Sequence, residues 1–152
     1  MAKAKYDDAD LLLRLYDLRR EALLRKARNW FLSQFQAYNW EDKIRKYPPG
    51  SEEERFSRMV ISYWDMVAGL VNNGLINDEL FFQTTGEHIR VWERVKPWIE
   101  IARTEINPLM YRNLEELVDR QQKWHEKRIS KYTKGRKTRP SKKKKTIKRK
   151  KR

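Results

Sequence analysis

The stretch that decides the fold is SEEERFSRMVISYWDMVAGLVNNG, residues 51–74. Within it, apolar side chains recur every three or four positions: Phe56, Met59, Val60, Tyr63, Val67, Leu70 and Val71. This is the spacing of one face of an α-helix. Ser51 and Glu54 match the capping box that opens helices, and Gly74 suits the left-handed backbone that often follows a helix end. We therefore predict a long helix with one buried face over this stretch.

The preceding part of the chain predicts one long helix and one short helix. The long helix covers residues 7–35, where apolar residues again keep helical spacing: Leu11, Leu15, Leu18, Ala22, Leu23, Ala27, Trp30 and Phe31. Two ion pairs between residues four apart are expected on its polar face: Asp10 with Arg14, and Glu21 with Arg25. Asn39 can cap the short helix, residues 40–47, which Pro48 then ends.

Two more helices are expected between residues 77 and 106. Asn77 can cap a short helix that carries the apolar residues 80–82. The next helix covers residues 89–106 and contains Pro97, which lacks a backbone N–H. Because a proline inside a helix removes one hydrogen bond and clashes with the preceding turn, we expect a kink or a split near Lys96.

The last helix is expected to begin at Pro108, with Asn107 as its cap, and to end no later than Gly135. No part of the sequence alternates apolar and polar residues as a half-buried strand does. We therefore predict an all-α protein. Its expected form is a compact bundle of four main helices and two short helices, followed by a disordered basic C-terminal tail.

The positive charge of the chain is concentrated at its C-terminal end. Of the 36 Lys and Arg residues, 16 lie in residues 127–152, where no Asp or Glu occurs. The other 20 share residues 1–126 with all 21 acidic residues, so this part has a net charge of about −1. We therefore divide the chain into a helical body, residues 1–126, and a polybasic tail, residues 127–152. Its few apolar side chains predict that the tail is disordered.

Such a tail is expected to bind a polyanion, most simply the phosphate backbone of DNA or RNA, including ribosomal RNA. Cationic side chains release the counterions of the phosphates, which gives affinity without reading the base sequence. The predicted nucleic-acid-binding residues are Lys127, Arg128, Lys131, Lys134, Arg136, Lys137, Arg139, Lys142, Lys143, Lys144, Lys145, Lys148, Arg149, Lys150, Lys151 and Arg152. An acidic membrane surface, an import signal and an acidic protein are the alternative uses of the same charge.

The aromatic residues of the body raise a second hypothesis, a surface for a protein partner. Most tryptophans fall on the apolar faces of the expected helices and predict core packing: Trp30, Trp92, Trp98 and Trp124. The partner-surface candidates are Trp40, Trp64, Phe81 and Phe82. Core packing is the simpler interpretation of Trp40 and Trp64 as well.

The sequence shows no catalytic or metal-binding pattern. It contains no Cys, and its two histidines, His88 and His125, have no Glu three residues before them and no zinc-type spacing. The five glycines form no phosphate-binding loop, and no serine lies in a nucleophile elbow. We therefore expect no enzyme activity, no cofactor and no metal site.

Several segments of the body carry a family resemblance. They are LLLRLYDLRRE at residues 11–21, YPPGSEEE at residues 47–54, YWDMVAGLVNNGLINDELF at residues 63–81, and the region of Gly86, Trp92 and Trp98. Through them, residues 11–113 resemble a family of small, uncharacterised bacterial all-helical proteins, a domain of unknown function. The resemblance implies an all-α fold and no function, and the polybasic tail lies outside it.

The leading functional hypothesis is a non-enzymatic binding protein. In it, a helical body contacts a protein partner or a second copy of itself, and the tail tethers the body to nucleic acid. The alternative is a helical interaction or structural module whose tail serves only targeting or solubility. The first residues, MAKAKYDDAD, lack the apolar core of a signal peptide, and no segment is apolar over the roughly 18 residues of a membrane span. We expect a cytoplasmic protein, associated with the nucleoid or the ribosome if bacterial.

Overall fold

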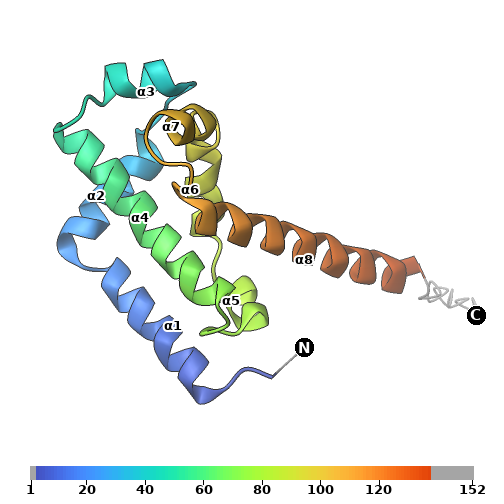
Figure 1. Cartoon of the computed structure of the whole chain (residues 1–152). Coiled ribbons are helices and arrows are strands. Elements are labelled where there is room, and N and C mark those ends of the chain that lie inside the picture. The colour runs from blue at the N-terminus through green and yellow to red at the C-terminus, as the bar shows by residue number, and fades with distance from the viewer. Residues whose placement is uncertain (1–2, 138–152) are drawn as a thin grey trace, which may run out of the picture.

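The structure is a computed structural model that describes residues 3–137 of the chain, with side chains as far as residue 133. Over this range it contains eight α-helices and no strand, which confirms the all-α prediction (Figure 1). The helices are α1 (Tyr6–Arg19), α2 (Ala22–Ser33), α3 (Trp40–Lys46), α4 (Glu52–Asn72), α5 (Asp78–Thr84), α6 (Glu87–Val95), α7 (Ile99–Glu105) and α8 (Arg112–Lys137). The expected six helices become eight because two predicted long helices are each divided in two.

Helix α4 is the centre of the body and confirms the interpretation of residues 51–74. The Ser51 hydroxyl accepts a hydrogen bond of 3.1 Å from the backbone N–H of Glu54, as an N-cap should. Gly74 lies just past the helix with a φ of +73°. Helix α4 packs most extensively against α8 and α2, and its buried face supplies much of the core. The apolar core residues of α4 are Phe56, Val60, Ile61, Trp64, Val67, Ala68 and Val71.

The prediction of a single helix over residues 7–35 is wrong, because the helix is interrupted between α1 and α2. The Glu21 carboxylate accepts hydrogen bonds from the backbone N–H groups of Leu23 at 3.0 Å and Leu24 at 2.9 Å. Glu21 is therefore the N-cap of α2, and no close ion pair with Arg25 is found among the described residues, although the charge of Arg25 is one of the smaller effects that lower the pKa of Glu21. A cap residue leaves the helical backbone conformation, so a new cap interrupts the preceding helix. The break lets α1 pack against α5 while α2 packs against α4.

In the C-terminal half of the chain, one predicted helix break is confirmed and one predicted helix start is wrong. Helix α6 ends at Val95 and α7 begins at Ile99, which confirms the split predicted from Pro97. Helix α8 begins at Arg112 and not at the predicted Pro108. Tyr111 explains the shift, because its φ of +54° lies in the left-handed region, which a continuous right-handed helix does not allow.

Three other local predictions are confirmed by hydrogen bonds or ion pairs. Asn39 and Asn77 cap α3 and α5, as expected from their position before each helix. The distances are 2.8 Å for Asp42 N–H to Asn39 Oδ1, 3.0 Å for Leu80 N–H to Asn77 Oδ1, and 2.9 Å for the Arg14–Asp10 ion pair.

Candidate nucleic-acid interface

Helix α8 is the longest helix of the described part of the chain, and its C-terminal half points away from the body (Figure 1). Its first half is anchored. Leu114, Leu117 and Val118 are buried in the core. The Gln121 amide donates a hydrogen bond of 2.9 Å to the backbone carbonyl of Thr85, while Arg120 forms an ion pair with Asp78. Together these contacts hold the start of α8 firmly against α4, α5 and α6.

The last contact between α8 and the body is a cluster around Glu79 of α5. The Trp124 indole N–H donates to Glu79 at 2.8 Å, and the Arg128 guanidinium reaches the same carboxylate at 2.8 Å. Arg128 also lies over the Trp124 ring, 4.9 Å from its centroid. Hydrogen bonds from Trp124 and Gln83 and the charge of Arg128 hold the pKa of Glu79 below its ordinary value. Arg128, predicted to bind phosphate, is therefore partly occupied by the body.

Two other predicted cations on α8 form no hydrogen bond or ion pair within residues 3–133. Lys127 and Lys131 are both exposed and, being four residues apart, lie on the same side of the helix. Tyr132 is also exposed, at 69% of its surface. A shallow groove runs along this side of α8, and the residues that line it are Glu79, Trp124, Lys127, Arg128, Lys131 and Tyr132. The helix thus presents lysines and one aromatic ring to solvent beyond the body.

The predicted boundary at residue 127 is not the end of the helix. Helix α8 continues to Lys137, past the predicted limit at Gly135, and residues 127–137 are helical although the tail from residue 127 was predicted to be disordered. The physical reason is that a helix already nucleated on the body can be extended at little cost by Lys and Arg, which are good helix formers and are favourable near a C-terminal end. Six of the predicted nucleic-acid-binding residues lie on this helical segment: Lys127, Arg128, Lys131, Lys134, Arg136 and Lys137. The other ten lie outside the described residues.

The four aromatic residues predicted as a partner surface do not form one. Their exposed fractions are 8% for Trp40, 2% for Trp64, 1% for Phe81 and 6% for Phe82. Trp40 stacks on Trp98 and donates to Glu105 at 2.6 Å, and the other three pack inside the core. The correction follows from their size, since burying a large aromatic ring stabilises a small bundle more than leaving it exposed. Trp92 and Trp98 are buried as predicted, while Trp30 and Trp124 are half-buried against the core.

One polar cluster was missed by the sequence analysis. The Arg28 guanidinium of α2 binds both oxygens of Glu87 in α6, with a distance of 2.7 Å from Nε to Oε1, and Arg19 of α1 lies 3.8 Å from Oε2. Burial alone would raise the pKa of Glu87, but the hydrogen bond from Arg28 and the charges of Arg28 and Arg19 outweigh it and lower the pKa. Residues 7–35 contain five arginines, but nothing in the sequence pointed to a partner 59 residues away.

Metal ligands and membrane spans were also sought in the described residues. Over residues 3–137, no group of three or more His, Asp or Glu side chains is placed to hold a metal ion. None of the described helices is both long and apolar enough to cross a membrane.

A family model described as "Domain of unknown function (DUF4760)" matches residues 6–124. The chain belongs to the DUF4760 family. The match begins at the first residue of α1 and ends at Trp124 of α8, so it covers the body and stops before the polybasic segment. No curated protein and no solved structure matches the chain. Membership of DUF4760 brings no function with it, so a function has to be argued from the residues of this chain.

Proposed function

We propose that this DUF4760 protein is a non-enzymatic nucleic-acid-binding protein, in which the end of α8 and the residues after it contact the phosphate backbone. The observation that carries the proposal is the separation of charge. Residues 127–152 hold 16 Lys and Arg and no acidic residue, beside a body whose charges nearly cancel. A dense run of cations without anions repels itself and is matched by a polyanion such as DNA or RNA.

The geometry of α8 supports the same proposal. The end of α8 points away from the body (Figure 1), and Lys127 and Lys131 are exposed beside and beyond its last contact at Glu79, so a nucleic acid can approach them from the solvent side. Among the described residues that line the groove on this side of α8, Glu79 is the one acidic residue, and it is already bound to Trp124 and Arg128. The competing hypothesis, a partner surface made of Trp40, Trp64 and neighbouring rings, has less support because these rings are buried.

The proposal is tested by the salt dependence of binding to a short duplex DNA and to an RNA hairpin. Each neutralised phosphate contributes about −0.9 to the slope of log K against log salt on duplex DNA. Full-length protein should bind both probes with a steep slope. A variant that ends at Lys137 keeps α8 and loses ten of the 16 cations, so its slope should fall by more than half.

A double substitution, Lys127→Gln with Lys131→Gln, should lower the duplex slope by up to about 1.8. The matched control is Arg14→Gln with Arg25→Gln, which removes two exposed cations of α1 and α2 and should change the slope little. If the shortened protein bound as tightly as the full chain, or if the control weakened binding as much as the lysine pair, the proposed interface would be wrong.

A further inference from the structure

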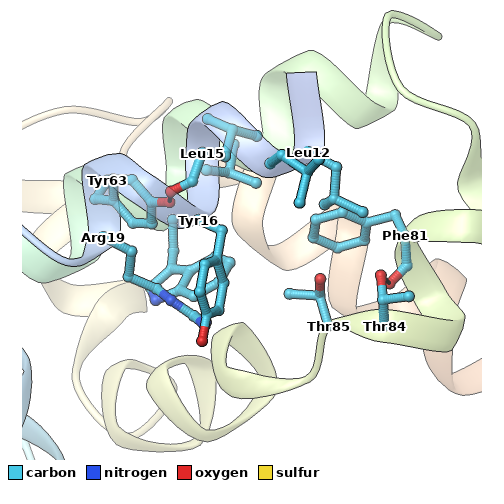
Figure 2. Close-up of a pocket in the computed structure, with 11 residues that line it drawn as sticks. Leu12, Leu15, Tyr16, Arg19, Tyr63, Phe81, Thr84 and Thr85 are labelled. Atoms are coloured by element: carbon cyan, nitrogen blue, oxygen red, sulfur yellow. Dashed lines mark hydrogen bonds between the residues drawn. The ribbon is translucent and has the colours of Figure 1, made fainter. Parts of the chain in front are cut away.

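A cavity of about 220 Å³ opens between α1, α4 and α5, away from the proposed nucleic-acid interface (Figure 2). Its apolar walls come from Leu12 and Leu15 of α1, Val67 of α4 and Phe81 of α5. An engineered apolar cavity of about 150 Å³ is large enough to bind benzene. The space therefore fits one aromatic ring with a short side chain, or a short alkyl chain of the same volume.

Arg19 gives this apolar cavity one charged wall. Its side chain is only 18% exposed, and the guanidinium lies 4.8 Å from the centroid of the Tyr16 ring and 5.7 Å from that of Trp64. These two rings hold the guanidinium at the edge of the cavity, as Figure 2 shows for Tyr16. A largely buried cation in such a place requires an anionic or polar partner.

The ionic partner of Arg19 within the protein is too distant to accept a hydrogen bond from it. Its nearest carboxylate oxygen, Oε2 of Glu87, is 3.8 Å away, which is too long for a hydrogen bond. Arg28 already binds both oxygens of that carboxylate, and the Trp64 indole N–H donates to one of them at 3.2 Å. In the described part of the chain, the Arg19 guanidinium donates no hydrogen bond. Its donors are thus available to a ligand.

The charge of the cluster indicates which anion fits. Arg19, Arg28 and Glu87 together carry a net charge of +1, which a monoanion would neutralise. A phosphate dianion would leave an uncompensated negative charge against apolar walls, which is costly. Thr85 lies across the cavity from Arg19 (Figure 2) and offers a hydroxyl that has no hydrogen bond with any of the described residues. A carboxylate group is the monoanion whose two oxygens match a guanidinium edge.

We propose that this cavity binds a small monocarboxylate with an aromatic or short alkyl tail. The carboxylate pairs with Arg19, and the tail fills the space between Leu12, Leu15, Val67 and Phe81. This site is independent of the proposed nucleic-acid interface, because none of the residues that line the cavity lies on α8.

The test is calorimetric titration of the full-length protein with phenylacetate and two probes of similar shape, phenylacetamide and phenyl phosphate. Phenylacetate should bind at least about tenfold more tightly than the neutral amide, because a charged hydrogen bond to arginine is lost with the amide. Arg19→Met keeps the length and apolar stem of the side chain and should remove this preference. Arg14→Met, on the exposed side of the same helix, should leave it unchanged.

Arg19→Lys provides a second variant in case Arg19→Met does not fold. It keeps the charge but loses the two-pronged geometry, so it should weaken phenylacetate binding and retain a preference for it over the amide. NMR locates the site in the unaltered protein. Methyl signals of Leu12, Leu15 and Val67 should shift with phenylacetate, while that of the exposed Ile101 on α7 should not.

Three results would overturn the proposal. The first is no heat and no methyl shift with phenylacetate at millimolar concentration. The second is an amide or phosphate probe that binds as tightly as the carboxylate. The third is a folded Arg19→Met variant that keeps the full preference for the carboxylate.

Discussion

His88 is a buried histidine without a good hydrogen-bond partner. Its ring is inaccessible to solvent and lies 5.5 Å from the Trp64 ring and 5.3 Å from the Phe81 ring. Neither ring nitrogen has a well-formed hydrogen bond, although the side chain of Gln121 lies next to it. Burial lowers the pKa of His88 to about 4, and the opposing effects of Gln121 and Glu87 are smaller. The imidazole is therefore neutral in the folded protein at neutral pH.

This neutral histidine makes folding stability depend on pH. In the unfolded chain its pKa is near 6.5, so the unfolded state takes up a proton as the pH falls below that value, while the folded state does not. The free energy of unfolding should thus decrease from about pH 6.5 down to the folded pKa near 4. The slope approaches about 1.4 kcal/mol per pH unit, for a total of about 3 kcal/mol. Glu87 affects stability in a different pH range. Because its pKa is lowered in the folded protein, the stability that it contributes is lost only as the pH falls below the ordinary pKa of a glutamate.

Urea unfolding at pH 7.5, 6 and 5 measures this effect. His88→Leu should flatten the pH dependence between pH 6.5 and 5, whatever its effect on stability at neutral pH. His125→Gln replaces an exposed imidazole on α8 and should retain the slope of the unaltered protein. A His88→Leu protein with an unchanged slope would show that another group is responsible.

Two glycines, Gly69 inside α4 and Gly74 just after it, should respond in opposite ways to substitution by alanine. Gly74 follows the helix with a φ of +73°, a conformation that disfavours any side chain even though the space around it is open. Gly69 lies inside α4, where an added Cβ would sit 3.6 Å from the amide of Asn113, an ordinary contact. Helix interiors favour Ala over Gly by about 1 kcal/mol, and a left-handed backbone costs a non-glycine residue about 1–2 kcal/mol.

Gly74→Ala should therefore destabilise the protein by about 1 kcal/mol, whereas Gly69→Ala should stabilise it by up to about 1 kcal/mol. Thermal and urea unfolding of the two variants against the unaltered protein would measure both values. Gly74→Asn is a useful control, because Asn tolerates this backbone conformation and should recover part of the loss. Equal effects of the two alanine substitutions would contradict the assignment of the helix end.

The sequence predicts helices well where a cap, an apolar stripe and a stop coincide, as they do in α4. It fails where one residue has two plausible roles. From the sequence, Glu21 fits two roles equally well, an ion-pair partner on a helix surface and an N-cap. Only the packing of α1 and α2 on different helices decides between these roles. Tyr111 gives no local sign of its left-handed backbone, since Asn and Gly are the residues usually found there.

The same contrast holds for the candidate sites. The concentration of cations after residue 126 is a property of composition, so the sequence alone reveals it. The cavity beside Arg19 depends on three helices that meet in space, and no spacing along the chain predicts it. Whether Trp64 or Phe81 is buried likewise depends on which helix covers it.

At the scale of the whole molecule, α8 connects two parts of different character. Its first half belongs to the core of the DUF4760 body, and its second half carries cations into solvent. The two halves meet at the Glu79, Trp124 and Arg128 cluster. Because Glu79 neutralises Arg128, this cluster also sets how many cations of α8 are available to a nucleic acid.

Single substitutions at this junction should change the salt dependence of nucleic-acid binding in a definite order. Lys127→Gln removes a free cation and should lower the slope on duplex DNA by up to about 0.9. Arg128→Gln should lower it by less, because binding through Arg128 requires breaking its pair with Glu79. Glu79→Gln should make the slope steeper, since it frees Arg128 and removes an acidic group from the groove beside it.

Amide hydrogen exchange gives an independent measurement of the same junction. Both Glu79→Gln and Arg128→Gln loosen the last contact of α8 with the body, so amides of residues 129–133 should exchange faster in both variants. Lys127 forms no hydrogen bond or ion pair with the described body residues, so Lys127→Gln serves as the control, with unchanged exchange. Faster exchange in Glu79→Gln together with an unchanged salt slope would separate the two roles, and would show that Arg128 anchors the helix without contributing to the interface.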